Sequence, residues 1–258
     1  FEELQLKEQA AGAFIAGGGI DVNGDNIYNY GAPPEIIKEG LSEYFIYTIE
    51  GKQDVPDKAS KRLKSFTARD VKFDILYRLR PHQYGPRPVR FFTLKNDEEH
   101  KLGTTPLPDG MVRTFRDNGR DGLCFLGQES VKYVPIKADI ELNVGTDDEI
   151  VEEYKHMAAA RSTFTFDQYK NVVGWDETRS FRDEVRNYKS KGIRIEVRRI
   201  IEGDVTLEAE GAKLHDYRTV EFAYDIKPAE KFGWEYRYTQ RLGTNAKQNR
   251  ILLAQNLK

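Results

Sequence analysis

The last third of the chain alternates apolar with charged residues. Apolar residues occupy every second position, at Ile193, Ile195 and Val197, and the charged residues Arg194 and Glu196 lie between them. This period with one polar side is typical of an antiparallel sheet that is covered on one face. We therefore predict that Ile195 and Val197 are core residues and that Arg194 and Glu196 are exposed.

Two later runs repeat the same period. Residues 220–226 and 234–238 place Val, Phe, Trp and Tyr at alternate positions, which predicts that Trp234 is buried. The period fails at Arg199-Ile200, where we expect a β-bulge. Several such strands with short turns predict an antiparallel β-sandwich.

Shorter β-branched and aromatic runs cover the middle of the chain, separated by loops rich in Gly, Pro, Asn and Asp. The loop from Asp117 to Gly122 has the composition of a hairpin turn. We predict a mainly β protein whose C-terminal part is Ig-like or fibronectin-like. The strands that we expect are Tyr44–Ile49, Val71–Leu79, Val89–Leu94, Met111–Phe115, Leu123–Leu126, Val131–Val134 and Ile140–Val144.

Two segments favour a helix instead. Residues 149–160 space their apolar side chains as a helix does and end in three alanines. Residues 245–258 carry a thin apolar stripe of Ile251, Leu252 and Leu257, which predicts a terminal helix. The composition of residues 149–160 also suits an exposed edge strand, so strand and helix both stay open there.

The chain of 258 residues is long enough for one large domain or two ordinary ones. We expect a tether at residues 1–40, a β-rich domain at 41–159 and the Ig-like domain at 160–258. Because the chain begins at Phe1 rather than Met, we expect any export signal to lie upstream of it.

Charge is balanced over the whole chain but not along it. The 40 Lys and Arg against 42 Asp and Glu leave a net charge of -2, which excludes a strongly basic binder of nucleic acid. The basic segment, Lys52–Lys95, has twelve Lys and Arg against four Asp and Glu. The acidic segment, Asp139–Glu153, has seven Asp and Glu and no Lys or Arg. The basic segment either receives an acidic partner or meets the acidic segment within the chain. The candidate patch is Lys61, Arg62, Lys64 and Arg69.

Cys124 is the only cysteine, so no disulfide can form within the chain. It lies between Leu123 and Phe125 in an expected strand, where a small core residue is the ordinary interpretation. No nucleophile elbow or phosphate-binding loop occurs in the sequence. We predict no catalytic residue.

Metal-binding spacing is also missing. The four histidines, His82, His100, His156 and His215, are scattered. Asp21 to Asn26 alternates oxygen-bearing side chains as a calcium loop does, but Asn26 and Ala32 stand where an EF-hand needs Gly and Glu. We predict a solvated turn at this loop and no cofactor or metal.

Trp175 is the one residue that suggests a sugar-stacking surface. It follows Gly174 near an expected strand turn, where an aromatic ring could lie exposed. Burial in the core is the more ordinary use of such a side chain.

Paired motifs in the middle of the chain resemble those of domain of unknown function 4139, a family found in mucoidy-inhibitor-like proteins. They are Leu102-Gly103, Pro106-Leu107-Pro108, Gly110 and Val112-Arg113, followed by Phe125-Leu126-Gly127-Gln128-Glu129. Residues 42–47, 185–198 and 222–238 also resemble the family, so the similarity spans about residues 41–241. The family pattern has residues 149–157 extended, and we follow it there.

The resemblance implies a mainly β module of an exported bacterial protein, periplasmic or at the cell surface. It supplies no catalytic residue. We therefore expect a non-enzymatic structural or protein-interaction module. A carbohydrate or acidic-polymer binder is the first alternative, and an unrecognised hydrolase is the second. We expect another protein or an acidic polymer as the partner, with no sequence-specific nucleic acid and no transmembrane segment, since no apolar run is long enough.

Overall fold

The computed structural model describes residues 36–41, 44–49, 52, 54–103, 105–120 and 122–254. Residues 1–35 of the tether expected at residues 1–40 lie outside these residues, as does the calcium-like loop at 21–26. Residues 36–40 of the expected tether belong to a strand instead. The elements are β1 (Ile36–Leu41), β2 (Tyr44–Ile49), β3 (Asp74–Leu79), α1 (Pro81–Tyr84), β4 (Val89–Lys95), β5 (Gly110–Asp117), β6 (Leu123–Val131), β7 (Asp139–Thr146), β8 (Ile150–Phe166), β9 (Val172–Asn187), β10 (Ile193–Ile200), β11 (Asp204–Ala209), β12 (Lys213–Leu214), β13 (Thr219–Ile226), β14 (Lys231–Gly243) and β15 (Arg250–Leu253).

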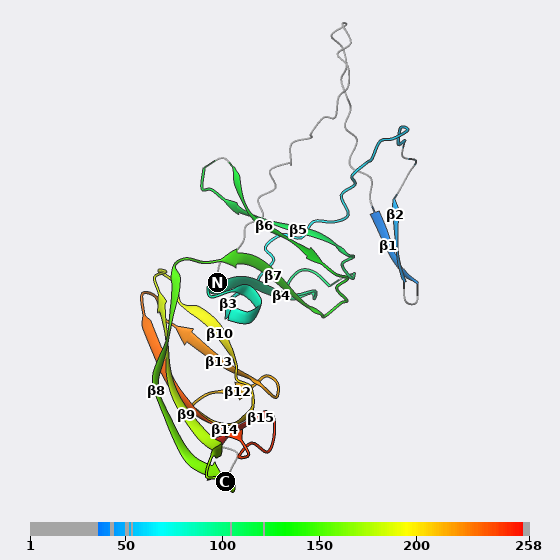
Figure 1. Cartoon of the computed structure of the whole chain (residues 1–258). Coiled ribbons are helices and arrows are strands. Elements are labelled where there is room, and N and C mark those ends of the chain that lie inside the picture. The colour runs from blue at the N-terminus through cyan, green and yellow to red at the C-terminus, as the bar shows by residue number, and fades with distance from the viewer. Residues whose placement is uncertain are drawn as a thin grey trace. The chain divides into compact units, whose positions relative to one another are not determined.

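The fold is mainly β, as predicted. One sheet has the order β12-β13-β10-β3-β4-β7 and another the order β15-β11-β14-β9-β8 (Figure 1). Two further pairs, β1-β2 and β5-β6, form small sheets of their own. Most of the strand pairs whose register is described are antiparallel, and β10-β3 and β11-β15 are the parallel pairs among them. Residues 150–166 form strand β8, so the helical spacing there was misleading.

The two large sheets pack face to face as a β-sandwich. Ile195 and Val197 of β10 are fully buried, as predicted, against side chains of β9, β11 and β14. Trp234 is buried too, and the ring of Phe181 stacks at 5.4 Å on Tyr236. Burial of this apolar area at about 25 cal/mol per Å² is the main force that holds the sheets together.

The expected bulge at Arg199-Ile200 is wrong. Strand β10 pairs with β13 residue by residue from Ile193 to Ile200 without a register shift. Arg199 therefore stays in phase and points inward, where the pattern leads one to expect an apolar residue. Glu196 is half-buried rather than exposed, because it pairs with Arg78 at 3.3 Å.

Two further predictions from local pattern fail. Residues 250–253 form strand β15, which pairs in parallel with β11, in place of the expected terminal helix. Cys124 is exposed rather than buried. Strand β6 belongs to a two-stranded sheet, and no second sheet among the described residues covers the Cys124 thiol.

By contacts the chain divides into two compact units, and neither is continuous in sequence. One contains the described residues within 36–73, 94–110 and 130–140, and the other contains those within 74–93, 111–129 and 141–254. The boundary that we expected between residues 159 and 160 falls inside β8. The Ig-like or fibronectin-like topology of the C-terminal part stays a prediction.

Within the first unit, Asn96 organises the long polar loop after β4. Its amide nitrogen donates to the carbonyl oxygens of Thr105, Val134 and Pro135 at 3.2–3.3 Å. Its side-chain oxygen accepts the N–H of Gly103 at 2.8 Å. Gly103 has a φ of 79°, and a Cβ there would meet the backbone of residue 97, so only glycine fits this close approach.

Candidate functional site

Arg199 is the only charged residue on the inner face of β10, and it belongs to an ionic network. Arg199 Nη2 lies 2.5 Å from Glu152 Oε1 of β8 and 2.8 Å from Asp183 Oδ1 of β9. Its guanidinium carbon lies 4.7 Å from the centre of the Tyr154 ring. Asp183 is fully buried, so the network joins the two sheets across their interior.

Burial is the largest influence on the pKa values of Glu152 and Arg199 in this network. It raises the pKa of Glu152 and outweighs the Arg199 guanidinium, which lowers it. Burial by itself lowers the pKa of Arg199, but the Asp183 carboxylate raises it above the ordinary value. Two converging carboxylates, of which Glu152 has a raised pKa, resemble a general-acid pair. However, both of them bind Arg199, and Asp183 has no exposed surface for a substrate. We therefore assign the network to stability.

The basic and acidic segments meet within the chain, because β4 and β7 are neighbours in one sheet. Four cations of the basic segment form ion pairs with carboxylates of the acidic segment. For these four cations, the pairs favour neutralisation within the chain over binding of an acidic partner. The pairs are Arg78 with Glu141 (2.5 Å), Arg87 with Asp148 (2.8 Å), Arg90 with Asp147 (3.7 Å) and Lys95 with Asp139 (3.8 Å).

The candidate patch Lys61, Arg62, Lys64 and Arg69 lies in the described stretch between β2 and β3, which has no helix or strand. All four side chains are exposed. Lys61, Lys64 and Arg69 already take part in interactions of the chain. Binding of an acidic polymer at this patch stays a prediction.

Trp175 is half-buried on β9 rather than an open surface ring. The guanidinium carbon of Arg161 lies 5.2 Å from the ring centre, on one of its faces. Arg161 also pairs with Glu177 at 3.0 Å, which holds the guanidinium in place. A sugar could stack only on the remaining surface of the ring, and this stacking stays a prediction.

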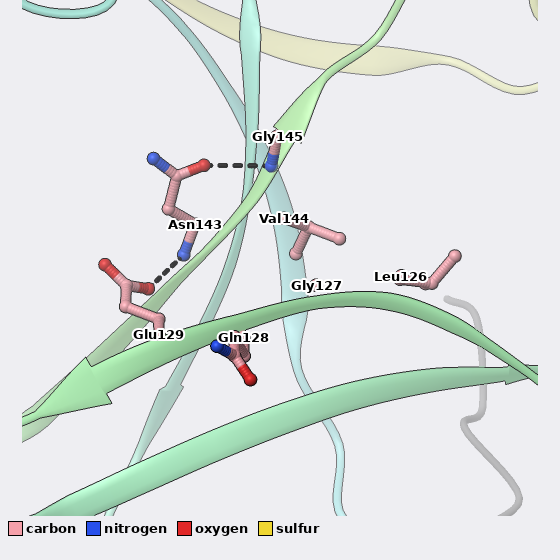
Figure 2. Close-up of a pocket in the computed structure, with 7 residues that line it drawn as sticks. All are labelled: Leu126, Gly127, Gln128, Glu129, Asn143, Val144 and Gly145. Atoms are coloured by element: carbon pink, nitrogen blue, oxygen red, sulfur yellow. Dashed lines mark hydrogen bonds between the residues drawn. The ribbon is translucent and has the colours of Figure 1, made fainter.

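A pocket of about 340 Å3 lies between β6 and β7, lined by residues 126–129 and 143–145 (Figure 2). Glu129 Oε2 accepts the backbone N–H of Asn143 at 2.5 Å, and the Asn143 side chain accepts the N–H of Gly145 at 2.9 Å. Strand β7 is the edge of its sheet. Glu129 therefore caps an edge N–H, which explains a carboxylate at the end of the Phe-Leu-Gly-Gln-Glu motif.

The hairpin β5-β6 has an uncovered apolar side. The rings of Phe115 and Phe125 meet edge to face at 5.5 Å, yet Phe125 is 55% exposed. The predicted turn is present, because Asn118 Oδ1 accepts the N–H of Arg120 at 2.8 Å and the φ of Gly119 is 74°. A two-stranded hairpin in water is marginally stable without a packed face. The exposed rings therefore leave an apolar side of the hairpin that the described residues do not fully cover.

No family model, no curated protein and no solved structure matches this chain. The resemblance to domain of unknown function 4139 thus rests on the motifs and stays a prediction. Within the described ranges, no three His, Cys, Asp or Glu side chains are grouped to hold a metal ion. No helix in the described part of the chain is long and apolar enough to span a bilayer.

Sequence reasoning missed the site residues that depend on pairing between distant strands. Arg199 was read as an interruption of the pattern, and Glu129 was read only as part of a motif. The alternation of Phe115 with Arg113 and Asp117 was visible in the sequence. It could have drawn attention to β5 as a strand with an apolar centre and opposite charges on either side.

Proposed function

We propose that this chain is a non-enzymatic protein-interaction β-module that associates with a second copy of itself through the edge of β5. The observation that carries the proposal is the side of β5 formed by Arg113, Phe115 and Asp117. These residues alternate, so they share one side of the strand. Among the described strands only β6 pairs with β5, which leaves the other edge of β5 unpaired.

The order of these side chains is self-complementary. An antiparallel two-fold pairing of two β5 strands centred on Phe115 sets Phe115 beside its own copy and Arg113 beside Asp117 of the second chain. Aromatic pairs and opposite charges across strands each stabilise a sheet by about 0.2–1 kcal/mol. The result is a four-stranded sheet, which is more stable than an isolated hairpin.

The test is the dimer dissociation constant, measured by sedimentation velocity over a range of protein concentrations. Each single reversal, Arg113→Glu or Asp117→Arg, places like charges across the axis and should weaken the dimer about tenfold. The double variant Arg113→Glu/Asp117→Arg restores opposite charges and should regain most of the affinity. The control Arg194→Glu changes an exposed arginine of β10 and should have no effect.

Cys124 supplies a second measurement. It is exposed and it is the only cysteine, so a nitroxide label needs no engineering. Pulsed electron spin resonance should give one short distance between two labels in the dimer. A monomer at every concentration, or a dimer indifferent to both reversals, would refute β5 pairing.

We also propose that the protein is exported to the periplasm or cell surface, which the family resemblance supports. Fractionation of cells that express the full gene tests it. Recovery of the protein only with the cytosol would contradict export and would leave the β5 proposal standing.

A further inference from the structure

Arg80 follows β3 directly, and its backbone is held in one position. Its carbonyl oxygen accepts the N–H groups of Gln83 and Tyr84, both at 2.9 Å, in the short turn of α1. Only 13% of the Arg80 side chain is exposed. The guanidinium is therefore largely withdrawn from water, where a cation needs partners.

The polar partners of the Arg80 guanidinium lie far from it. Arg80 Nη1 lies 3.4 Å from the Gln83 side-chain oxygen, and Nη2 lies 3.8 Å from Glu196 Oε2. Its Nε is buried and has no hydrogen-bond partner. By contrast, Arg78 on the same strand binds Glu141 through two nitrogens, at 2.5 and 2.6 Å. A well-paired guanidinium has bonds of about 2.7–2.9 Å, so Arg80 is underpaired.

Strand register adds positive charge at the same place. In the parallel ladder Glu196 faces Arg78 and Val197 faces Leu79, so Arg198 and Arg80 come next on adjacent strands. Burial lowers the pKa of Arg80, and the charges of Arg198 and Arg78 lower it further. Like charges side by side across strands are destabilising unless an anion lies between them.

Arg198 already has its own partners. Its Nε donates to Glu221 at 2.6 Å, and its Nη1 donates to the ring nitrogen Nε2 of His215 at 2.9 Å. Glu196 is closer to Arg78 (3.3 Å) than to Arg80 (3.8 Å). Three guanidinium groups thus gather here with the carboxylates of Glu141, Glu196 and Glu221. Arg80 has the longest contacts of the three arginines.

We propose that Arg80 is the centre of a binding subsite for a phosphate or sulfate group, with Arg198 as the second cation. A tetrahedral oxyanion offers several acceptors to the loosely held Nη groups of Arg80. The subsite recognises the oxyanion group alone, whether free or carried on a small molecule. It does not depend on the pairing of β5.

The experiment follows the Arg80 Nε–H signal by proton–nitrogen correlation spectroscopy, with the signal assigned by its loss in Arg80→Lys. Sodium phosphate, sodium sulfate and glucose 1-phosphate are titrated at an ionic strength held constant with sodium chloride. Each oxyanion should shift this signal in a saturable way and raise the melting temperature. Equal affinity for free phosphate and glucose 1-phosphate means that the protein contacts only the phosphate group. Tighter binding of the ester means that its sugar adds contacts.

Arg80→Gln should weaken binding about tenfold or more, because it removes the charge-assisted hydrogen bonds to the oxyanion. The matched control is Arg87→Gln, an exposed arginine that pairs with Asp148, and it should bind as the wild type does. A signal that moves equally in chloride, or binding unchanged in Arg80→Gln, would overturn the subsite. The titration of the wild-type protein stays decisive even if a variant fails to fold.

Discussion

Arg199 of β10 and Asp183 of β9 lie 2.8 Å apart across the interior of the sandwich, measured from Nη2 to Oδ1. Arg199 occupies a position that Ile193, Ile195 and Val197 lead one to expect to be apolar. The ion pair thus ties together two sheets whose other inner contacts are mostly apolar and aromatic.

Removing one partner of this pair should be costly. Arg199→Met leaves Asp183 and Glu152 as buried carboxylates without a cation, which should reduce the free energy of unfolding by about 3–5 kcal/mol. Urea unfolding measures this reduction in the free energy of unfolding. The triple variant Arg199→Met/Asp183→Leu/Glu152→Gln removes every charge and should recover most of the stability. A loss below about 1 kcal/mol in the single variant would contradict the interpretation, since exposed changes cost that little.

Glu152 should make stability depend on pH in a defined direction. Burial raises its folded-state pKa above the ordinary value of 4.5. The folded protein then holds the proton more tightly than the unfolded chain, so this contribution is full below pH 4.5 and is lost as the pH rises through the folded pKa. The wild type should therefore lose stability relative to Glu152→Gln as the pH rises from 4.5 towards neutrality. Urea midpoints at several pH values measure this, and the exposed neighbour serves as the control variant Glu153→Gln. A difference that grows in the opposite direction would disprove it.

The alternation along β10 predicts two very different costs. Ile195 is fully buried, so Ile195→Ala should reduce the free energy of unfolding by about 2–5 kcal/mol. The Arg194 side chain is 60% exposed and reaches Asp225 only at 3.7 Å, so Arg194→Ala should cost about 0.5 kcal/mol or less. Equal losses in urea melts would mean that the inward face is assigned wrongly.

The exposed thiol of Cys124 should be reactive in the native protein. A chromogenic disulfide reagent should modify one thiol per chain without denaturant, nearly as fast as in the unfolded chain, because no packed side chains block access. The control measures the same reaction in concentrated urea. A native thiol that reacts only after unfolding would show that β6 is covered in solution.

Local pattern determined most of the strands and, in most of these, the inward face. Side chains of a strand alternate between two sides, and burial requires one side to be apolar, so Val197 and Trp234 could be assigned from their neighbours alone. The hairpin turn before Gly122 was equally local, because Gly and Asn adopt its backbone angles at little cost.

Tertiary structure decided what depends on a distant partner. Arg199 is inward because Asp183 and Glu152 neutralise it from the opposite sheet, and no local period contains that information. Residues 250–253 are a strand because β11 offers its edge in parallel, which overrides a weak helical stripe.

The same reason separates Cys124 from Ile195. Both were expected to be core residues of a strand, but a second sheet covers only β10, so the Ile195 side chain is buried and the Cys124 side chain is exposed. The sequence by itself determined most of the strands and their alternation. Only the packing of β10 against β9, β11 and β14 decided which apolar faces are core, because burial needs a second surface.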